Sequence, residues 1–430
     1  MQDAKIVGGP LDGKIMDLSG GWHDAGDYIK FMITITNTTY FLLFAYKENP
    51  ELFSDNYLAD GMPGKNNIPD VLDEAKYGLD FIMKMHPEKN VLLYQVGGEE
   101  DHATFRLPFN DIANYKTKPY RPAYYGAGAN ICGRAAASLA LAYTIWKEKL
   151  NNENYAKKCL KHAKEIFRLG KKNMFAIDSN PDEYYNENTF YDDMELGAIE
   201  LYKATKNDLY LKLAQTYAMK CGSGKGWLDW GTINFIAHYE LYPYASSFTK
   251  ELLKNYMKDD LEKNFSIYKN NPFGMSVEYV WGSMSVLTGT FIKGVLYKKL
   301  FGDKKYDEMT LSARDYLLGK NPWGVCFIVG YGYNYPKNVH GQIPQLLKKE
   351  VFGTPIEGPL SQKEFSSLGI RLSGKDRYAK FNSPIAVYHD NKEDYSSNEM
   401  TIFQGALTLT MFSFLSTDKK CKDKVPYIRK

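Results

Sequence analysis

Long apolar runs are missing from this chain, and no stretch approaches the roughly 20 residues that a membrane-spanning helix needs. A basic, apolar and small-residue leader is also missing, so no signal peptide is predicted in it. An excess of one charge is missing as well, because 54 basic and 51 acidic residues are interspersed and the formal net charge is +3. These absences argue against a membrane protein and against a nucleic-acid-binding surface.

Cysteine is scarce, and the five residues are scattered without a CxxC pair. This usage indicates neither a disulfide framework nor a structural zinc site. The GxSxG, HExxH, Walker and dinucleotide-binding signatures are absent too. Aromatic residues, in contrast, make up 15% of the chain. Flat and partly polar rings suit the walls of a carbohydrate cleft, although many of them also fill protein cores.

Helical periodicity dominates the chain. Apolar residues recur at spacings of three and four in eleven segments, which are 34–47, 70–86, 130–149, 153–169, 191–204, 207–220, 231–242, 246–260, 280–300, 303–318 and 399–416. Two long connecting loops, 87–127 and 319–395, have the length that usually accompanies function. No low-complexity linker divides the chain. We therefore expect a single domain over residues 1–430, built from successive helical hairpins.

Three carboxylates lie in loops or at a helix start. Asp24 and Asp27 stand in the Gly-flanked stretch GGWHDAGDYIKF, and Glu399 stands in DYSSNEMT at the start of the last predicted helix. Glycoside hydrolysis requires two separated carboxyl groups, one ionised to take a proton from water and one protonated to donate to the leaving oxygen. Roles in turns and in helix capping remain alternatives for all three residues.

Several stretches resemble one family in order along nearly the whole chain. SGGWHDAGDYIKF resembles the GGW-x-DAGD-x-x-KF motif of glycoside hydrolase family 9, a family of inverting cellulases. The stretches that follow in family order are DVLDEAKYGLDFIMKMH, DHATFRLP, AAASLALA, DDMELGAIELYKAT, YVWGSMSV, DYLLGKNPWGVCFIVGYG and EDYSSNEMT. The resemblance implies an all-α fold, an (α/α)6 barrel of twelve helices with its cleft at the loop end.

The resemblance also implies roles for individual residues. Asp27 matches the general base, Asp24 the residue that helps to position the nucleophilic water, and Glu399 the general acid. Inversion then predicts a separation of roughly 6.5–9.5 Å between the carboxyl groups of Asp27 and Glu399. Substrate contacts are expected at five positions, which are His102, Arg121, Trp281, His340 and Tyr395. For Trp281 a stacking platform and a core position are both open.

Some positions depart from the family pattern. Gln342 stands where the family usually carries the Arg of an HxR motif, so a neutral amide replaces a guanidinium expected to bind sugar hydroxyls. Gly405 and Met284 each replace an Asn, and the loop YGAGAN at 125–130 replaces a PGSD-like loop. These differences leave the identity of the glycan open.

A further departure lies at the start of the chain. Relatives place one barrel helix, and in one subgroup an immunoglobulin-like domain, ahead of the DAGD stretch, whereas 23 residues precede Asp24 here. We therefore expect a barrel that lacks the family's first helix. The apolar faces of that helix's neighbours would then be exposed and available for dimerisation.

The resemblance bears on cofactors as well. The chemistry requires none, but Asp192 and Asp193 in YDDMEL stand where some relatives bind a structural Ca2+. The alternative is an acidic pair that complements the start of a helix. Calcium takes six to eight oxygen ligands, and the others cannot be located from the sequence.

The function expected from these observations is that of an inverting glycoside hydrolase. It would cleave β-1,4-glucosidic bonds in cellulose or related β-glucan poly- or oligosaccharides as an endoglucanase. One alternative is an exo-acting β-glycosidase on oligosaccharides, such as a cellobiohydrolase, glucosidase or glucosaminidase. Another is a catalytically impaired carbohydrate-binding protein. Because the family is commonly exported, we expect the full-length protein to be secreted or periplasmic.

Overall fold

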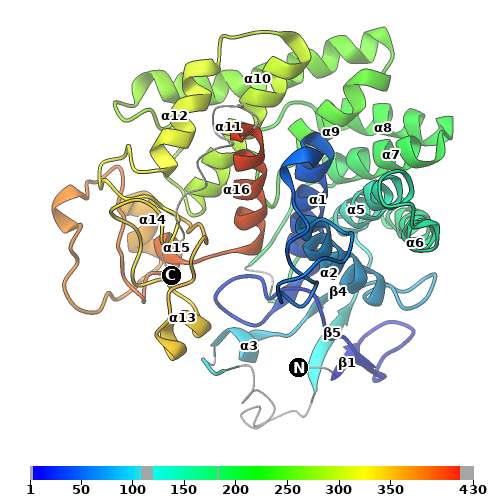
Figure 1. The fold of residues 1–430 in the computed structure, drawn as a ribbon, viewed down its shortest axis with the longest axis horizontal. Coiled ribbons are helices and arrows are strands. Elements are labelled where there is room, and N and C mark those ends of the chain that lie inside the picture. The colour runs from blue at the N-terminus through cyan, green and yellow to red at the C-terminus, as the bar shows by residue number, and fades with distance from the viewer. Residues whose placement is uncertain (1–2, 104, 108–119, 182–183, 417–430) are drawn as a thin grey trace.

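Eleven helices of eight residues or more form the body of the protein in the computed structural model, which describes residues 3–103, 105–107, 120–181 and 184–416 (Figure 1). They are α1 (Met32–Glu48), α2 (Asp70–Lys84), α5 (Ala129–Glu148), α6 (Glu153–Lys172), α7 (Tyr191–Thr205), α8 (Asp208–Cys221), α9 (Asn234–Leu241), α10 (Ser247–Asn270), α11 (Ser283–Phe301), α12 (Asp307–Leu317) and α16 (Ile402–Leu415). Each of the eleven periodic segments overlaps one of these helices, so the predicted helices are confirmed.

Six of the helices form a closed inner ring. Helices α1, α5, α7, α9, α11 and α16 contact one another in this order, and α16 returns to α1. Outer helices lie against this ring: α2 against α1, α6 against α5, α8 against α7, α10 against α9 and α11, and α12 against α11. Within the described residues the outer layer thus has five long helices. The architecture is the predicted (α/α)6 barrel.

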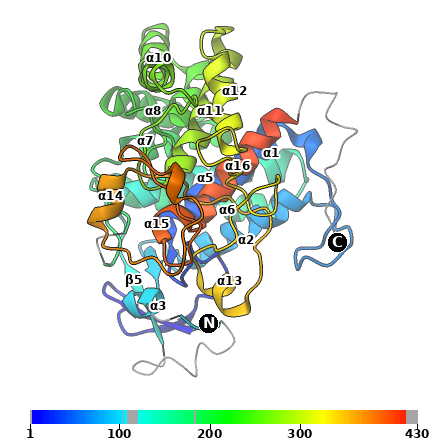
Figure 2. The same cartoon turned by 90° about the vertical axis from the view of Figure 1, so that its left-hand side faces the viewer.

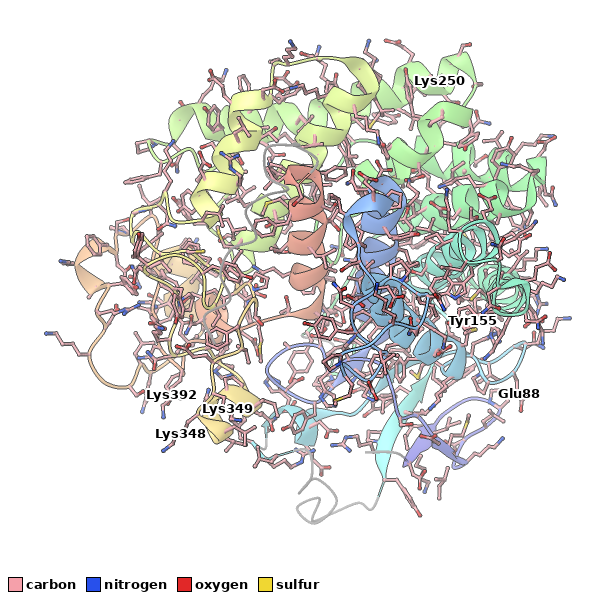
Figure 3. The ribbon with its side chains drawn as sticks, viewed as in Figure 1. Glu88, Tyr155, Lys250, Lys348, Lys349 and Lys392 are labelled. Atoms are coloured by element: carbon pink, nitrogen blue, oxygen red, sulfur yellow. The ribbon has the colours of Figure 1, made fainter. Side chains whose placement is uncertain are left out.

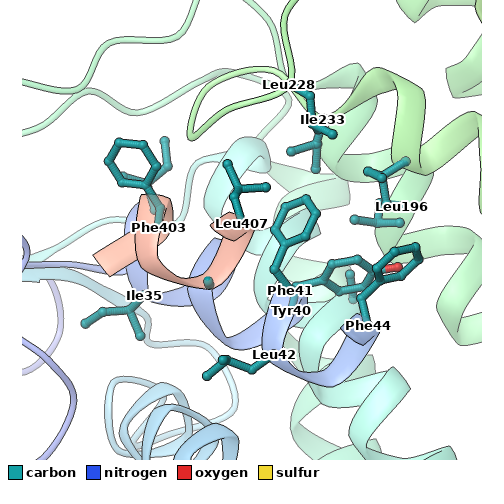
Figure 4. Packing of buried hydrophobic residues seen from close by; sticks show 14 of the residues in the cluster. Ile35, Tyr40, Phe41, Leu42, Phe44, Leu196, Leu228, Ile233, Phe403 and Leu407 are labelled. Carbon is teal, nitrogen blue, oxygen red and sulfur yellow. The ribbon is translucent and has the colours of Figure 1, made fainter. Parts of the chain in front are cut away.

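The inner helices are buried on nearly all sides, which explains their composition. In α1, Tyr40, Phe41 and Phe44 pack in the core against residues of neighbouring inner helices (Figure 4). Three buried threonine hydroxyls of α1 donate to carbonyl groups one turn earlier, as Thr36 Oγ1 does to Met32 O at 2.7 Å. A buried hydroxyl with such a partner avoids the cost of an unsatisfied polar group.

Two glycines bring α5 and α7 into direct backbone contact. A Cβ atom on Gly133 would overlap the backbone at Asp193, and one on Gly197 would lie 2.6 Å from the carbonyl oxygen of Gly133. Side chains at these two positions would therefore push the helices apart. This close crossing also places Arg134, the next residue of α5, beside Asp193.

A small sheet lies at one end of the barrel and was not predicted. Its strands are β1 (Asp3–Val7), β2 (Ile15–Asp17), β3 (Lys30–Phe31), β4 (Leu93–Val96) and β5 (Arg121–Tyr125), in the order β2-β1-β5-β4-β3. The β1–β5 pair is parallel and the other pairs are antiparallel. Strands of two to five residues are too short for a recognisable alternation. The short helices α3 (Glu99–Ala103) and α13 (Gln342–Leu347) lie at this same end (Figure 2).

The outward face of α16 is only partly covered. Ile402, Gly405, Leu409 and Phe412 follow one another along this face and are partly exposed. A cavity of about 720 Å³ opens beside its first turn, lined among others by Trp22, Tyr77, Phe352 and Met400.

Charged side chains extend outward over the rest of the surface. Lys348 and Lys349, directly after α13, and Lys392 in a C-terminal loop are exposed (Figure 3). Among the described residues, no helix combines the length and apolar character that crossing a membrane demands.

Candidate active site

The segment from Asp24 to Asp27 forms a compact loop before β3. The Asp24 amide donates to Ile29 O at 2.9 Å, and the Ile29 amide donates to Asp27 Oδ1 at 3.1 Å. The carbonyl of Asp24 accepts from the Ile402 amide at 3.0 Å, which ties the loop to the start of α16. Segments far apart in the sequence therefore meet at this loop.

Gly26 allows the loop to approach Glu399 and Gly341 closely. Its amide donates to Glu399 Oε1 at 3.0 Å, and its carbonyl accepts from the Gln342 amide at 2.8 Å. A Cβ atom at this position would lie 2.7 Å from Glu399 Oε1 and 2.8 Å from the Cα atom of Gly341. A residue with a side chain would thus displace either the carboxyl group or the backbone.

Glu399 directly follows the short helix α15 (Tyr395–Asn398). The carboxylate of Asp394 caps this helix and accepts from the amides of Ser396 and Ser397, both at 3.1 Å. The amide of His340 donates to Asn398 O at 2.9 Å, and the Glu357 amide donates to Glu399 O at 2.9 Å. Glu399 therefore sits on a segment held from both sides.

The environment of Glu399 favours its protonated form. Burial raises the pKa of Glu399 well above its usual range, and the neighbouring carboxyl groups of Asp27 and Glu357 raise it further. The hydrogen bond from the Gly26 amide acts in the opposite direction but does not outweigh them. A carboxyl group kept neutral near pH 7 is able to donate a proton.

Asp24, the first residue of this loop, is buried and only 3% exposed. Tyr185 Oη donates a short hydrogen bond to Asp24 Oδ2, while Oδ1 has no hydrogen-bond partner among the described residues. Burial raises the pKa of Asp24 to about 7, and the neighbouring hydroxyls of Thr34 and Tyr185 limit this rise. The unpartnered oxygen can accept a hydrogen bond from a small polar molecule such as water.

Asp27 is the more accessible of the two aspartates. Its Oδ2 lies 2.8 Å from His102 Nδ1, and the exposed fraction of the side chain is 46% for His102 and 12% for Asp27. His102 belongs to α3, and its ring lies 5.0 Å from that of Tyr184. The structure thus brings together the predicted residues Asp24, Asp27, His102 and Glu399.

An aromatic wall continues from this centre. The ring of Tyr395 lies 5.9 Å from that of His340 and 5.3 Å from that of Trp281. Trp281 is 43% exposed, so its ring is open to solvent and not a core residue. His340 Nδ1 donates to Lys392 O at 2.7 Å, and burial lowers the pKa of His340, which favours the neutral ring. Exposed rings of this kind can stack on the apolar faces of sugars.

Packing places Arg121 and Gln342 in the interior beneath this region. Arg121 is 9% exposed, and its Nε donates to the fully buried Asp101 at 2.8 Å, so it supports α3 from below and does not line an open surface. Gln342 is fully buried as well. Its Oε1 accepts from the Arg106 amide at 2.8 Å and its Nε2 donates to Asp101 O at 3.2 Å. Gln342 therefore holds the segment that carries His102.

The family model described as glycosyl hydrolase family 9 matches residues 1–411. The chain belongs to glycosyl hydrolase family 9. It is therefore a glycoside hydrolase, and the resemblance seen in the DAGD and NE stretches is confirmed.

Individual relatives agree with this membership. The chain is 26% identical over 455 residues to Endoglucanase 7 of Oryza sativa subsp. japonica, covering 93% of this chain and 81% of the relative. It is 25% identical over 465 residues to Endoglucanase A of Bacillus pumilus, covering 97% of this chain and 63% of the relative. The chain thus spans different shares of its family members' lengths.

Solved structures of the family share the fold. A metagenome-derived glycoside hydrolase family 9 endoglucanase superimposes with a TM-score of 0.80 at 22% identity, over 96% of this chain and 74% of that chain. The cellulase Cel9M of C. cellulolyticum in complex with cellobiose superimposes with a TM-score of 0.73 at 24% identity, over 92% and 87% respectively.

The pair Asp192 and Asp193 lies apart from this centre, at the start of α7. Asp193 Oδ1 accepts from Arg134 Nε, and Asp192 Oδ2 accepts from the Ile233 amide at 3.0 Å. Both residues are buried. The structure thus pairs Asp193 with an internal guanidinium and does not open the two carboxylates to solvent.

A second group with metal-ligating side chains lies nearby. The ligand atoms of Glu195, Cys221 and His238 lie within 4.8 Å of one another. Two of them share a hydrogen bond, since His238 Nδ1 lies 2.8 Å from Glu195 Oε1, while Cys221 Sγ accepts from Asn234 Nδ2. Burial raises the pKa of Cys221 well above its usual range, which disfavours the thiolate that a metal requires.

Two contributors to the site were missed by the sequence analysis. Tyr185 bonds to Asp24, and Glu357 is buried with its pKa raised to about 8 by burial and by neighbouring carboxylates, Asp24 among them. Neither residue lies in a sequence motif or a residue spacing that predicts a functional role. Tertiary contacts alone reveal them.

Proposed function

We propose that this chain hydrolyses β-1,4-glucosidic bonds in cellulose or related β-glucans with inversion, acting as an endoglucanase. One observation carries the proposal: the amide of Gly26, between the two aspartates, donates to Glu399 at 3.0 Å. This contact joins an accessible aspartate to a carboxyl group whose pKa is raised well above its usual range. An acid and a base in different environments are the pair that this hydrolysis needs.

In this proposal the carboxylate of Asp27 takes the proton from water, and the unpartnered Oδ1 of Asp24 helps to hold that water. Glu399 donates its proton to the leaving oxygen of the glycosidic bond. His102, which bonds to Asp27 Oδ2, orients that carboxylate and contacts the sugar beside it. The requirement for an ionised Asp24 and a protonated Glu399 gives the reaction a pH window.

The aromatic wall supports a poly- or oligosaccharide as the substrate. Trp281, Tyr395 and His340 present adjacent rings, so successive pyranose rings can stack along them. The names of the relatives from Oryza sativa and Bacillus pumilus, both endoglucanases, favour an endo-acting enzyme. The cellobiose bound by the C. cellulolyticum cellulase favours a β-1,4-linked glucan.

The test is hydrolysis of four substrates, carboxymethyl-cellulose, mixed-linkage glucan, xyloglucan and chitosan, followed by reducing-sugar release. We expect activity on at least one of the two unbranched glucans, with an early fall in viscosity as endo cleavage requires. Inversion predicts α-configured product as the first anomer in an NMR time course. Release of one short product without a fall in viscosity would instead identify an exo-acting β-glycosidase.

Two variants separate catalysis from binding. Glu399→Gln and Asp27→Asn should each lower kcat by about 1,000-fold, because general acid and base catalysis typically contributes 10²–10⁴-fold. Binding of cellotetraose by calorimetry should change little in either variant. Asp390→Asn, a carboxylate of a neighbouring loop that accepts from the Asn338 amide, serves as the control. Equal activity of Glu399→Gln and the parent protein would exclude this mechanism, and binding without turnover in the parent would identify a carbohydrate-binding protein.

Assembly and location form a further part of the proposal. We propose that residues 1–430 act as one catalytic domain and that the exposed stripe of α16 pairs with a second copy. The partly exposed Leu409 and Phe412 support this, because apolar stripes on a surface favour association. Light scattering of the parent and of Phe412→Ser tests the dimer. Export to the periplasm or medium is proposed, like the glucan substrate, from the similarity to endoglucanases of the family. Fractionation of expressing cells tests this location.

A further inference from the structure

A buried arginine binds carboxylates in the region where the resemblance places a calcium ion. Arg134 of α5 is 1% exposed. Its Nε donates to Asp193 Oδ1, its Nη2 donates to Glu187 Oε1 at 2.7 Å, and its Nη1 donates to Trp230 O. One guanidinium therefore binds oxygens from three segments, which are the start of α7, the loop before it and the loop before α9.

These contacts neutralise and cross-link the carboxylates, as a bound metal cation would. Positive charge reaches Asp193 and Glu187 by direct ion pairs, and it also acts on Asp192 and Asp229 nearby. A planar guanidinium with fixed N–H directions cross-links its partners in a defined geometry. The three segments are thereby fixed to the inner ring of the barrel.

The remaining oxygens do not form a calcium site. Glu187 Oε2 accepts from Asn130 at 2.7 Å, Asp192 Oδ2 accepts from the Ile233 amide, and Asp229 Oδ1 accepts from the Gly231 and Thr232 amides. Two buried oxygens of the acidic pair have no hydrogen-bond partner among the described residues, Asp192 Oδ1 and Asp193 Oδ2. Calcium takes six to eight oxygens, and a guanidinium beside it would repel it. The residues present do not fit Ca2+ while Arg134 is in place.

The cross-link also leads to the candidate active site. Glu187 follows Tyr185 by two residues, and the ring of Trp230 lies 4.8 Å from the ring of Tyr185 in an edge-to-face arrangement. Tyr185 Oη donates to Asp24. Arg134 thus holds both the segment that carries Tyr185 and the residue that packs against its ring.

We propose that Arg134 is a built-in cation that replaces a structural Ca2+ in this barrel and positions Tyr185, and that its removal exposes a latent calcium site. The latent site consists of the carboxylates of Glu187, Asp192 and Asp193 with the carbonyl oxygen of Trp230. This inference concerns the scaffold and holds whichever glycan is the substrate.

The test compares thermal unfolding in EGTA and in millimolar CaCl2. For the parent protein we expect the same Tm in both. Arg134→Met should lower Tm in EGTA by about 5 °C, because breaking a buried ion pair is strongly destabilising in a chain of this length. CaCl2 should restore at least about half of that loss in a saturable manner, as binding to the folded state requires. NaCl at equal ionic strength should not.

Three further variants keep the outcome interpretable. Arg134→Met combined with Asp193→Asn should lose the rescue by calcium, since it lacks a ligand. Arg314→Met, a surface arginine of α12 paired with Asp315, should show no calcium dependence. Arg134→Lys retains a charge and should stay independent of calcium. If Arg134→Met does not yield folded protein, the parent in EGTA and Arg134→Lys decide the question.

Two results would overturn the inference. One is a saturable rise in the Tm of the parent protein with micromolar calcium, because it would show a bound Ca2+ beside Arg134. The other is a folded Arg134→Met variant that calcium does not stabilise. These readouts do not depend on hydrolysis, so they stay separate from a failure of the proposed function.

Discussion

Tyr185→Phe tests the proposed part of Asp24 in the reaction. The variant removes the hydroxyl that donates to Asp24 Oδ2 and keeps the ring, which lies 4.9 Å from the ring of Phe31 and 4.8 Å from that of Trp230. Packing is therefore preserved and a single hydrogen bond to a carboxylate is lost. The change isolates the protonation of Asp24.

The size of the effect follows from the structure. Burial already raises the pKa of Asp24 to about 7, and the hydroxyls of Thr34 and Tyr185 oppose that rise. A hydrogen bond to a charged group contributes about 1.5–3 kcal/mol, so its loss moves the equilibrium between carboxylate and carboxylic acid by about 10- to 100-fold. The pKa of Asp24 then rises further. On the acidic side of the pH profile, kcat/KM should fall by that same factor.

The assay is kcat/KM on a chromophoric cello-oligosaccharide from pH 4 to pH 9. The acidic limb of the profile should move to higher pH in Tyr185→Phe, with recovery as the pH rises. The alkaline limb reflects loss of the proton from Glu399, whose pKa is also raised, and should stay in place. Tyr155→Phe is the matched control, because Tyr155 Oη donates to Asp80 at 2.9 Å on the outer helices (Figure 3). An equal loss of activity at every pH would refute the reasoning.

The other predictions concern the loop, the buried acid and the buried amide. Gly26→Ala should lower kcat/KM by about 100-fold, since its Cβ would lie 2.7 Å from Glu399 Oε1, and Ala25→Gly is the control. Glu357 keeps its proton in the folded state up to about pH 8 but loses it near pH 4.5 when unfolded, so stability falls as the pH rises between these values. In urea titrations, the parent's free energy of unfolding should therefore include a fall of about 3 kcal/mol between pH 4.5 and pH 7 that Glu357→Gln lacks. The same pH dependence in the variant and the parent would contradict this. Gln342→Leu should cost about 2 kcal/mol of stability, because the buried Arg106 amide loses its acceptor, whereas the neighbouring Ile343→Leu should cost less.

The helices could be predicted from the sequence because their signal is local. Apolar residues at spacings of three and four mark α6, whose buried Cys159, Ile166 and Phe167 face the inner ring. The closed order of the inner ring needed contacts between segments far apart. Gly133 and Gly197 show the reason. In the sequence, a glycine within a helix only lowers the predicted helix stability, and its role in close packing becomes evident only from the position of the partner helix.

The sequence by itself determined the helical fold and the three carboxylates offered for catalysis, since both follow from residue type and spacing. Only the tertiary structure decided what surrounds them. Burial and the contacts with Thr34 and Tyr185 set the protonation of Asp24, and burial together with carboxylates from distant segments sets that of Glu399. In the same way, packing turned Gln342 inward and placed Arg134 among acidic residues. Charge and solvation depend on neighbours in space, and a linear pattern does not contain them.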